Sequence, residues 1–225
     1  MSKLIFIEGP NGVGKSHVSW HIKASLPPQN FDVTLEPFTP ELAEAANVIP
    51  AGGYPGNPDA IDYTTQALIY AADRRAHMRE VFFWLYPNSS NFHVICDRGP
   101  LSMMVYQGLV GGVDLDWLLS LNRVAMQGVN VAATILLHAP FDITVQRIEE
   151  RGTPLTQDER DELRPAWEAY ESLRLGTHDA NGHVQHFVSK WKDLTGWIYY
   201  IDADRPAVEV EADVIATIHQ VIQAA

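Results

Sequence analysis

Leu4-Ile5-Phe6-Ile7-Glu8-Gly9-Pro10-Asn11-Gly12-Val13-Gly14-Lys15-Ser16 starts as an apolar run and ends in a segment that fits the pattern G-x-x-x-x-G-K-[ST]. The run predicts a buried strand, and a helix is expected to follow from Lys15. In such a segment the glycines let backbone N–H groups face phosphate oxygens, the lysine reaches the β- and γ-phosphates, and the Ser16 hydroxyl can ligate Mg²⁺. The stretch predicts a nucleoside triphosphate site, the alternative being a glycine-rich turn with a solvated lysine. The predicted nucleotide contacts are Gly9, Asn11, Gly12, Val13, Gly14, Lys15, Ser16 and His17.

The composition favours a single domain that acts on a small molecule. The chain has 225 residues, 46% of them hydrophobic, which is enough for a sizeable core. Its 16 basic and 28 acidic residues give a net charge of −12. Nucleic-acid backbones are bound by clustered Lys and Arg, so this balance argues against nucleic acid as a partner.

The sequence also predicts a cytoplasmic location. Cys96 is the one cysteine, so an internal disulfide is excluded and a reducing compartment is expected. The first ten residues lack the charged and apolar regions of a signal peptide, and no apolar run approaches 18 residues. We therefore expect no membrane partner.

Apolar runs of strand length alternate with helical patterns along the chain. The predicted strands cover residues 4–7, 31–35, 93–96, 133–137 and 197–201. The predicted helices cover residues 15–25, 60–86, 114–127, 141–150, 158–174 and 207–223. Alternation of this kind predicts a five-stranded parallel sheet covered on both faces, a three-layer α/β/α fold, in one domain over residues 1–225. The glycine- and proline-rich residues 49–59 form either a surface loop or a flap near the substrate.

A second phosphate-site feature follows the third predicted strand. Asp97 ends this buried run and Arg98 comes next, so both are expected at the carboxyl edge of the sheet, where ligands bind in open α/β folds. A carboxylate there is the expected Mg²⁺ partner of Ser16, and a guanidinium is the expected phosphate ligand. The alternative is an ion pair that faces solvent.

An ordered set of short motifs resembles the thymidylate kinases over essentially the whole chain. The matching residues are Ile7-Glu8-Gly9, Glu36-Pro37, Ala71-Ala72-Asp73-Arg74 with His77, Asp97-Arg98 with Ser102 and Tyr106-Gln107-Gly108, Leu121-Asn122, and Ile201-Asp202-Ala203. The resemblance implies a P-loop kinase fold and transfer of the γ-phosphate of ATP to dTMP, with Mg²⁺ as cofactor. It also implies a homodimer, for which residues 114–127 offer a helical interface, although an apolar helix face is more often core.

The acceptor nucleotide is expected along one face of the long predicted helix. The residues that recur there at spacings of three and four are Gln66, Tyr70, Asp73 or Arg74, and His77. The resemblance implies that Tyr70 stacks on the base and Arg74 contacts a base carbonyl; the alternative is that Tyr70 packs in the core while Asp73 and Arg74 make surface contacts. It also implies that Tyr106 excludes a ribose 2′-hydroxyl, unless Tyr106 merely caps its helix. The predicted acceptor-binding residues are Asn11, Phe38, Tyr70, Arg74, Arg98, Ser102, Met103, Tyr106 and Gln107.

Four arginines surround a predicted lid at about residues 151–160. They are Arg147, Arg151, Arg160 and Arg164. The phosphate loop itself has no arginine, so the resemblance implies catalytic arginines in the lid, with Arg151 favoured and Arg147 next. The alternative for any of them is a solvated pair with Glu149, Glu150 or Asp158. The predicted catalytic residues are Lys15, Arg98, Arg151 and Arg147.

Several positions depart from the family pattern. They are Asn11, where an acid is usual, Leu35, where arginine is common, Gly99-Pro100, and Met103, where small polar residues are common. Other acceptors therefore stay open, namely dUMP, a 5-substituted dUMP or a modified base in DNA. A second alternative is a non-kinase ATP-binding or ATPase module. The histidine pairs His17/His21 and His183/His186 are interpreted as surface residues, and Cys96 as a core residue. Trp167 and Tyr170 are expected to pack the lid helix.

Overall fold

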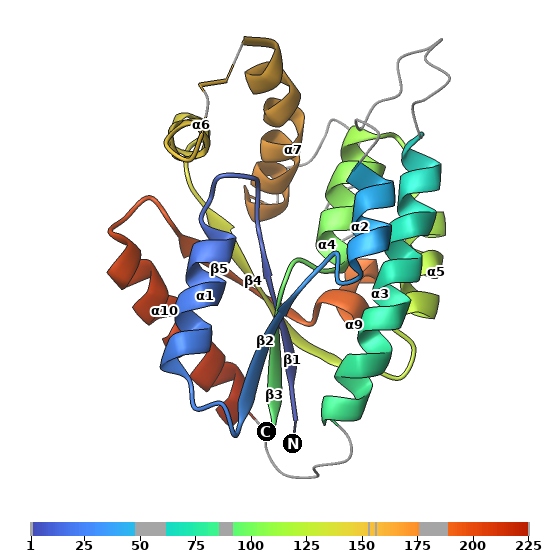
Figure 1. The fold of residues 1–225 in the computed structure, drawn as a ribbon, viewed down its shortest axis with the longest axis vertical. Helices are drawn as coiled ribbons and strands as arrows, with labels where there is room; N and C mark the ends of the chain where they lie inside the picture. The colour runs from blue at the N-terminus through green and yellow to red at the C-terminus, as the bar shows by residue number, and fades with distance from the viewer. Residues whose placement is uncertain are drawn as a thin grey trace.

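Five parallel strands form the centre of the molecule in the order β2-β3-β1-β4-β5 (Figure 1). This computed structural model describes residues 2–47, 62–85, 92–152, 154–155, 157–175 and 189–224. The strands are β1 (Leu4–Glu8), β2 (Phe31–Leu35), β3 (His93–Asp97), β4 (Val131–His138) and β5 (Trp197–Asp202). The predicted three-layer α/β/α fold is confirmed.

The sheet separates two hydrophobic cores because successive side chains of a strand point to opposite faces. In β1, Leu4 and Phe6 belong to one core and Ile5 and Ile7 to the other, and all four are fully buried. Such all-apolar strands are typical of parallel sheets covered on both sides. The uninterrupted apolar run of residues 4–7 is explained by the position of β1 at the centre of the sheet.

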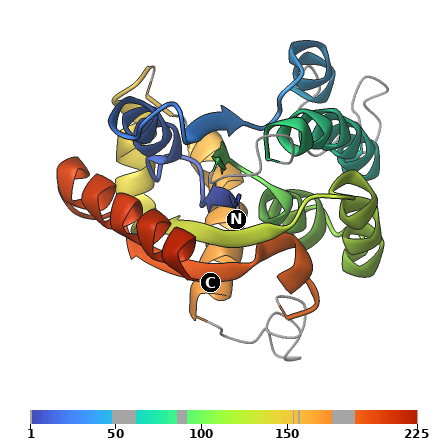
Figure 2. The same ribbon diagram turned by 90° about the horizontal axis from the view of Figure 1, so that it is seen from below.

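Helices cover both faces, as the two views show (Figures 1 and 2). One core is closed by α1 (Lys15–Ser25) and α10 (Ala207–Gln223). The other is closed by helices from the middle of the chain, namely α3 (Tyr63–Leu85), α4 (Pro100–Met103), the π-helical η1 (Met104–Val110), α5 (Leu115–Ala125), α7 (Gln157–Leu175) and α9 (Lys192–Thr195). The remaining described helices are α2 (Pro40–Asn47) and α6 (Phe141–Glu149).

The predicted boundaries differ from the structure mainly at capping residues and short elements. Asp114 precedes α5 and accepts a hydrogen bond from the Trp117 N–H at 2.7 Å, so it caps the helix rather than starting it. The short helices α2 and α9 were not predicted, since eight- and four-residue segments carry little periodicity. Residues 49–59, His183 and His186 lie outside the described part of the chain.

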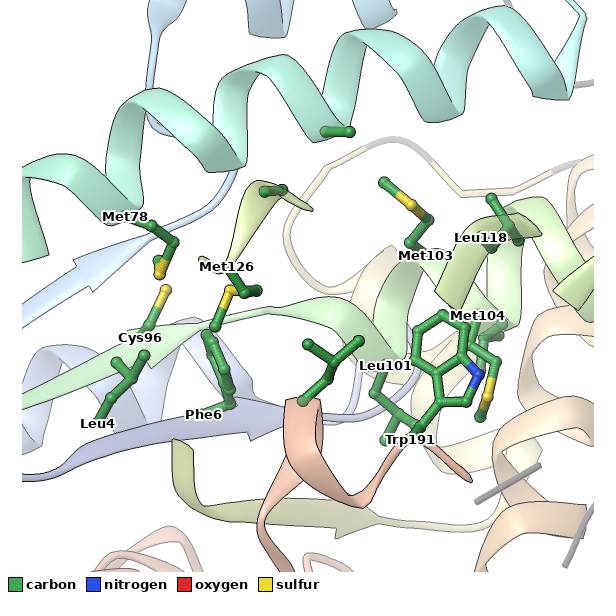
Figure 3. Close-up of a cluster of buried hydrophobic side chains, with 14 of the residues drawn as sticks. Leu4, Phe6, Met78, Cys96, Leu101, Met103, Met104, Leu118, Met126 and Trp191 are labelled. Atoms are coloured by element: carbon green, nitrogen blue, oxygen red, sulfur yellow. The ribbon is translucent and has the colours of Figure 1, made fainter. Parts of the chain in front are cut away.

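Cys96 lies in the larger core, as expected, beside Met78 and Leu4 (Figure 3). Burial raises the pKa of its thiol well above the usual value, which fits a packing role and not a nucleophilic one. Helix α5 likewise turns Leu118 and Leu119 into this core but leaves Val124 67% exposed. A dimer through α5 stays a prediction. None of the described helices combines the length and apolar character needed to cross a membrane.

Candidate active site

The phosphate loop (residues 9–16) joins β1 to α1 at the carboxyl edge of the sheet. Gly12 and Gly14 adopt positive φ angles of 82° and 108°, a backbone conformation that side-chain-bearing residues rarely adopt. Gly14 caps α1 and offers no side chain to the N–H groups of its first turn. These groups, at the positive end of the helix, are therefore suited to an anion.

The two glycines offer a matched test of the loop. A Cβ atom on Gly12 would lie 2.2 Å from the Thr144 carbonyl oxygen, whereas no described atom lies within 4 Å of the Cβ position on Gly14. We expect Gly14→Ala to cost about 1–2 kcal/mol through backbone strain alone, and Gly12→Ala about 1–3 kcal/mol more through the clash. Denaturant unfolding of the two variants measures the difference. Equal losses would contradict the packing of this loop against α6.

Lys15 is held inside the loop by backbone carbonyl groups. Its Nζ atom donates to the oxygens of Gly9 at 2.7 Å and Pro10 at 2.9 Å, and the residue is 6% exposed. Burial, assisted by the charges of Arg98 and Arg151, lowers the pKa of Lys15 to about 7, although Asp97 and Glu8 oppose the shift. A negatively charged group in the loop would reverse this effect and favour the ammonium form.

Ser16 and Asp97 meet as the sequence predicted. The Ser16 hydroxyl donates to Asp97 Oδ2 at 3.0 Å, although the two residues are 81 positions apart. Asp97 is 8% exposed, and its Oδ1 atom has no hydrogen-bond partner within the described ranges. A hydroxyl and a carboxylate with an unpaired oxygen are the hard oxygen donors that Mg²⁺ prefers, so these residues fit that ion.

Arg98 connects the phosphate loop to the helices after β3. Its backbone has a φ of 74°, which is rare for arginine. The guanidinium donates to Asn11 Oδ1 at 2.6 Å and to Ser102 Oγ at 3.3 Å, and it lies 5.7 Å from the centre of the Tyr106 ring. Burial opposes its charge, but Tyr106, Tyr170, Glu8 and Asp97 raise its pKa. The cation therefore lies between the loop and η1.

Glu8 organises the backbone around this arginine and was not among the predicted site residues. The fully buried carboxylate accepts hydrogen bonds from the Gly99 and Ser102 N–H groups at 2.8 and 2.9 Å, the Ser102 hydroxyl at 2.7 Å and the Tyr170 hydroxyl at 3.0 Å. Burial raises its pKa, and Ser102 and Arg98 oppose that shift. An acid that ends an all-apolar buried strand must find such partners, which is the sequence signal for this role.

Tyr170 extends this network to α7. Its side chain is 2% exposed and packs in the core, as predicted, while its hydroxyl reaches Glu8 and lies 3.1 Å from Ser102 Oγ. Its ring meets that of Tyr106 edge to face at 6.3 Å. The helix after the predicted lid is thus bonded directly to residues beside Arg98. Trp167 also packs as expected, edge to face on Phe141 with its indole N–H bonded to Ala139.

The predicted acceptor face of α3 carries a buried polar cluster. Arg74 is 3% exposed and donates to Glu36 Oε2 through Nε at 2.8 Å and through a terminal nitrogen at 2.6 Å, and it also bonds Asn122 Oδ1. His77 lies 3.2 Å from Glu36 Oε1 and 3.0 Å from the Thr34 hydroxyl. Burial opposes the charge of Glu36, but Arg74 and His77 lower its pKa.

Asp73 and Arg74 are not surface residues, so that part of the alternative is wrong. Asp73 is 1% exposed and accepts the backbone N–H groups of Phe38 and Thr39 at 2.7 and 2.6 Å, which fixes the segment after β2. The Phe38 ring stacks on His77 with centroids 4.5 Å apart. Tyr70, half-buried, packs against the core.

Three other predicted acceptor residues, Tyr106, Gln107 and Met103, have different surroundings. Tyr106 lies inside η1 with its ring toward Arg98 and Tyr170, so it does not cap its helix. Gln107 Nε2 donates to Gln66 of α3 at 3.3 Å. Met103 is 2% exposed in the core (Figure 3) and meets the Asn122 amide. Met103 is thereby linked to Arg74 through Asn122, and direct contact of Met103 with a base stays a prediction.

The four predicted lid arginines have different surroundings. Arg147 donates to the Val13 carbonyl of the phosphate loop at 3.2 Å and to Ala203 at 2.8 Å. Arg151 is exposed and close enough to Lys15 to lower its pKa. Arg160 pairs with Glu149 at 2.6 Å, and Arg164 stacks on Phe141. Arg160 thus matches the ion-pair alternative, whereas Arg147 and Arg151 lie beside the loop. Residues 153 and 156 of the lid are outside the described ranges.

A family model described as thymidylate kinase matches residues 7–214. The thymidylate kinase of Anoxybacillus flavithermus (strain DSM 21510 / WK1) is 30% identical over 227 residues, covering 99% of this chain and all of the relative. Those of Geobacillus sp. (strain WCH70) and Limosilactobacillus reuteri (strain DSM 20016) are each 30% identical, covering 96% of this chain and 95% of the relative.

Proposed function

The chain belongs to the thymidylate kinase family, and we propose that it transfers the γ-phosphoryl group of ATP to dTMP, yielding ADP and dTDP. The observation that supports this most is the position of Arg98. Its guanidinium bonds Asn11 of the phosphate loop and Ser102 before η1, with the Tyr106 ring alongside. The Arg98 cation thus lies between the phosphate loop, where ATP is expected, and the predicted acceptor residues of η1. Phosphoryl transfer between two bound nucleotides needs a positive charge in such a place.

In this proposal the donor phosphates bind backbone N–H groups of the phosphate loop, to which Pro10 contributes none, with Lys15 Nζ beside them. Ser16 and Asp97 would hold Mg²⁺, which neutralises phosphate charge when bound. Arg151, on the exposed side of the loop, stabilises the negative charge of the transferring group, and Arg147 holds the loop through Val13. No general base is needed because the acceptor phosphate is already anionic.

The acceptor site of the proposal lies between α3, η1 and the segment after β2. Tyr70 and Phe38 offer aromatic surface to the base, and Arg74 offers a guanidinium whose orientation is fixed by Glu36 and Asn122. Tyr106 lies beside the sugar and disfavours a 2′-hydroxyl by its bulk. We further propose one catalytic domain over residues 1–225, a lid at about residues 151–160, a homodimer and a cytoplasmic location.

An ATP-coupled assay tests the proposed reaction directly. The purified protein is given ATP with Mg²⁺ and, in parallel, dTMP, dUMP, 5-substituted dUMP, the matching ribonucleotides and a thymine-containing oligonucleotide. We expect dTMP to give the highest kcat/KM, with dTDP and ADP formed in equal amounts. A preference for another monophosphate would replace dTMP as the acceptor. Turnover of ATP that no monophosphate accelerates would overturn the kinase proposal in favour of an ATPase.

A further inference from the structure

Two histidines of α1 and a glutamate of α10 form a compact cluster within the first two turns of these helices. His17 Nε2 lies 2.9 Å and His21 Nδ1 lies 3.3 Å from the same oxygen, Glu211 Oε1. The imidazole rings are 4.5 Å apart, and His21 Nδ1 is also 3.2 Å from the His17 carbonyl oxygen. The two ring side chains are 49% and 44% exposed, whereas the glutamate is 15% exposed.

These distances match the spacing of ligands around a tetrahedral metal. Zinc binds nitrogen and oxygen at about 2.0–2.1 Å, so two ligands at a tetrahedral angle lie about 3.3 Å apart. One ligand atom from each of the three residues lies within 4.8 Å of the others. We propose that His17, His21 and Glu211 bind a first-row transition ion, Zn²⁺ being the best fit, as a clamp between α1 and α10. The exposed rings leave the remaining coordination position open to water.

The second such cluster in the described part of the chain has different chemistry. Glu36, His77 and Cys96 also bring three ligand atoms together. However, both oxygens of Glu36 are already bonded, one to Arg74 and one to His77, and burial raises the pKa of the Cys96 thiol. A metal there would have to displace a buried ion pair and deprotonate a buried thiol. At the α1–α10 cluster it replaces only hydrogen bonds at the surface.

The proposed zinc site differs from the predicted Mg²⁺ site in its ligand atoms and in the effect that a bound metal would have. Imidazole nitrogens favour Zn²⁺, Ni²⁺ or Co²⁺, whereas the oxygen ligands Ser16 and Asp97 suit Mg²⁺. Helices α1 and α10 lie side by side on one face of the sheet in both views (Figures 1 and 2) and share one core. A clamp would therefore fix the helix that follows the phosphate loop. This inference extends beyond the phosphotransfer and does not depend on it.

Zinc binding to the untagged full chain tests the site without any assay of activity. We would titrate Zn²⁺ calorimetrically in millimolar Mg²⁺, which occupies oxygen-only sites, and follow Tm in parallel. We expect about one Zn²⁺ per chain and a Tm that rises with zinc, because binding to the folded state alone stabilises it. Co²⁺ should give the visible absorption of a tetrahedral site. Absence of zinc binding to the wild-type chain would overturn the proposal.

Variants of His21 and Glu211 test whether the zinc ion binds at this cluster. His21→Ala and Glu211→Gln should each weaken zinc binding by about tenfold or more, since losing a residue that only hydrogen-bonds a metal ligand already costs that much. The Tm increase at a given zinc concentration should be correspondingly smaller. His219→Ala, an exposed histidine elsewhere on α10, is the matched control and should bind as the wild type does. Tm values without zinc report whether each variant is folded. Unchanged binding in both His21→Ala and Glu211→Gln would assign the ion to other residues and refute the clamp.

Discussion

Lys15→Met should lower kcat by roughly 10²–10³-fold, which is the cost of removing one preorganised hydrogen-bond donor that stabilises charge in the transition state. The loss should occur without unfolding. Folding places the Lys15 ammonium in a buried position where its pKa falls to about 7, so an uncharged side chain of similar length removes an unfavourable burial. Single-turnover kinetics and thermal unfolding of the same preparation measure both effects.

The matched control for this substitution lies on the same helix. Lys23 is in the last turn of α1 and its exposed side chain lies 3.7 Å from Asp32. Lys23→Met should change kcat by less than about twofold, because exposed ion pairs contribute little. Equal losses in both variants would indicate a general effect on α1. A Lys15→Met enzyme with wild-type kcat would remove Lys15 from the proposed machinery.

The lowered pKa of Lys15 gives a second readout in the same experiment. In the free protein Lys15 is largely neutral above pH 7, and a bound phosphate raises its pKa by favouring the ammonium form. Nucleotide binding at pH 8 should therefore take up about one proton, decreasing as the pH falls below 7. Calorimetry of ADP binding in two buffers of different ionisation enthalpy measures this uptake, which should be absent in Lys15→Met.

Much of the phosphate loop and its surroundings could be predicted because their structure depends on local sequence. The apolar run of β1 and the glycines after it determine a buried strand, a turn and a helix within a short segment. Asp97 could be placed next to Ser16 because parallel strands end at a common edge, and β1 and β3 are indeed neighbours, with Ile7 opposite Asp97. Here strand order alone brings distant residues together.

The remaining contacts depend on packing between elements far apart in the sequence. His17 and Glu211 are 194 positions apart, and nothing local to α1 signals that a carboxylate of α10 lies between its two histidines. The four donors to Glu8 come from the turn after β3, from α4 and from α7, and no periodicity of the chain predicts them. The helix spacing placed Arg74 on one face with Gln66, Tyr70 and His77, but its burial depends on the position of Glu36, which the spacing does not predict.

Arg74→Met should destabilise the protein by about 3–5 kcal/mol, because it leaves the Glu36 carboxylate buried without its cation. A direct role in binding dTMP therefore has to be separated from this structural cost. The double variant Glu36→Gln/Arg74→Met removes both charges and should recover part of the stability while His77 keeps a partner in the glutamine. Denaturant unfolding of the wild type, both single variants and the double variant gives the coupling energy.

Kinetics of the double variant then separate the two roles of Arg74. If its guanidinium contacts the base, kcat/KM for dTMP should fall by at least about tenfold even where stability is recovered, since a charged hydrogen bond contributes about 1.5–3 kcal/mol. ADP binding should be unchanged. Arg75→Met is the control on the next residue, where the arginine bonds the Gln127 carbonyl at the surface, and it should alter neither quantity. Recovery of wild-type dTMP use in the double variant would make Arg74 purely structural and leave the base to Tyr70, Phe38 and their neighbours.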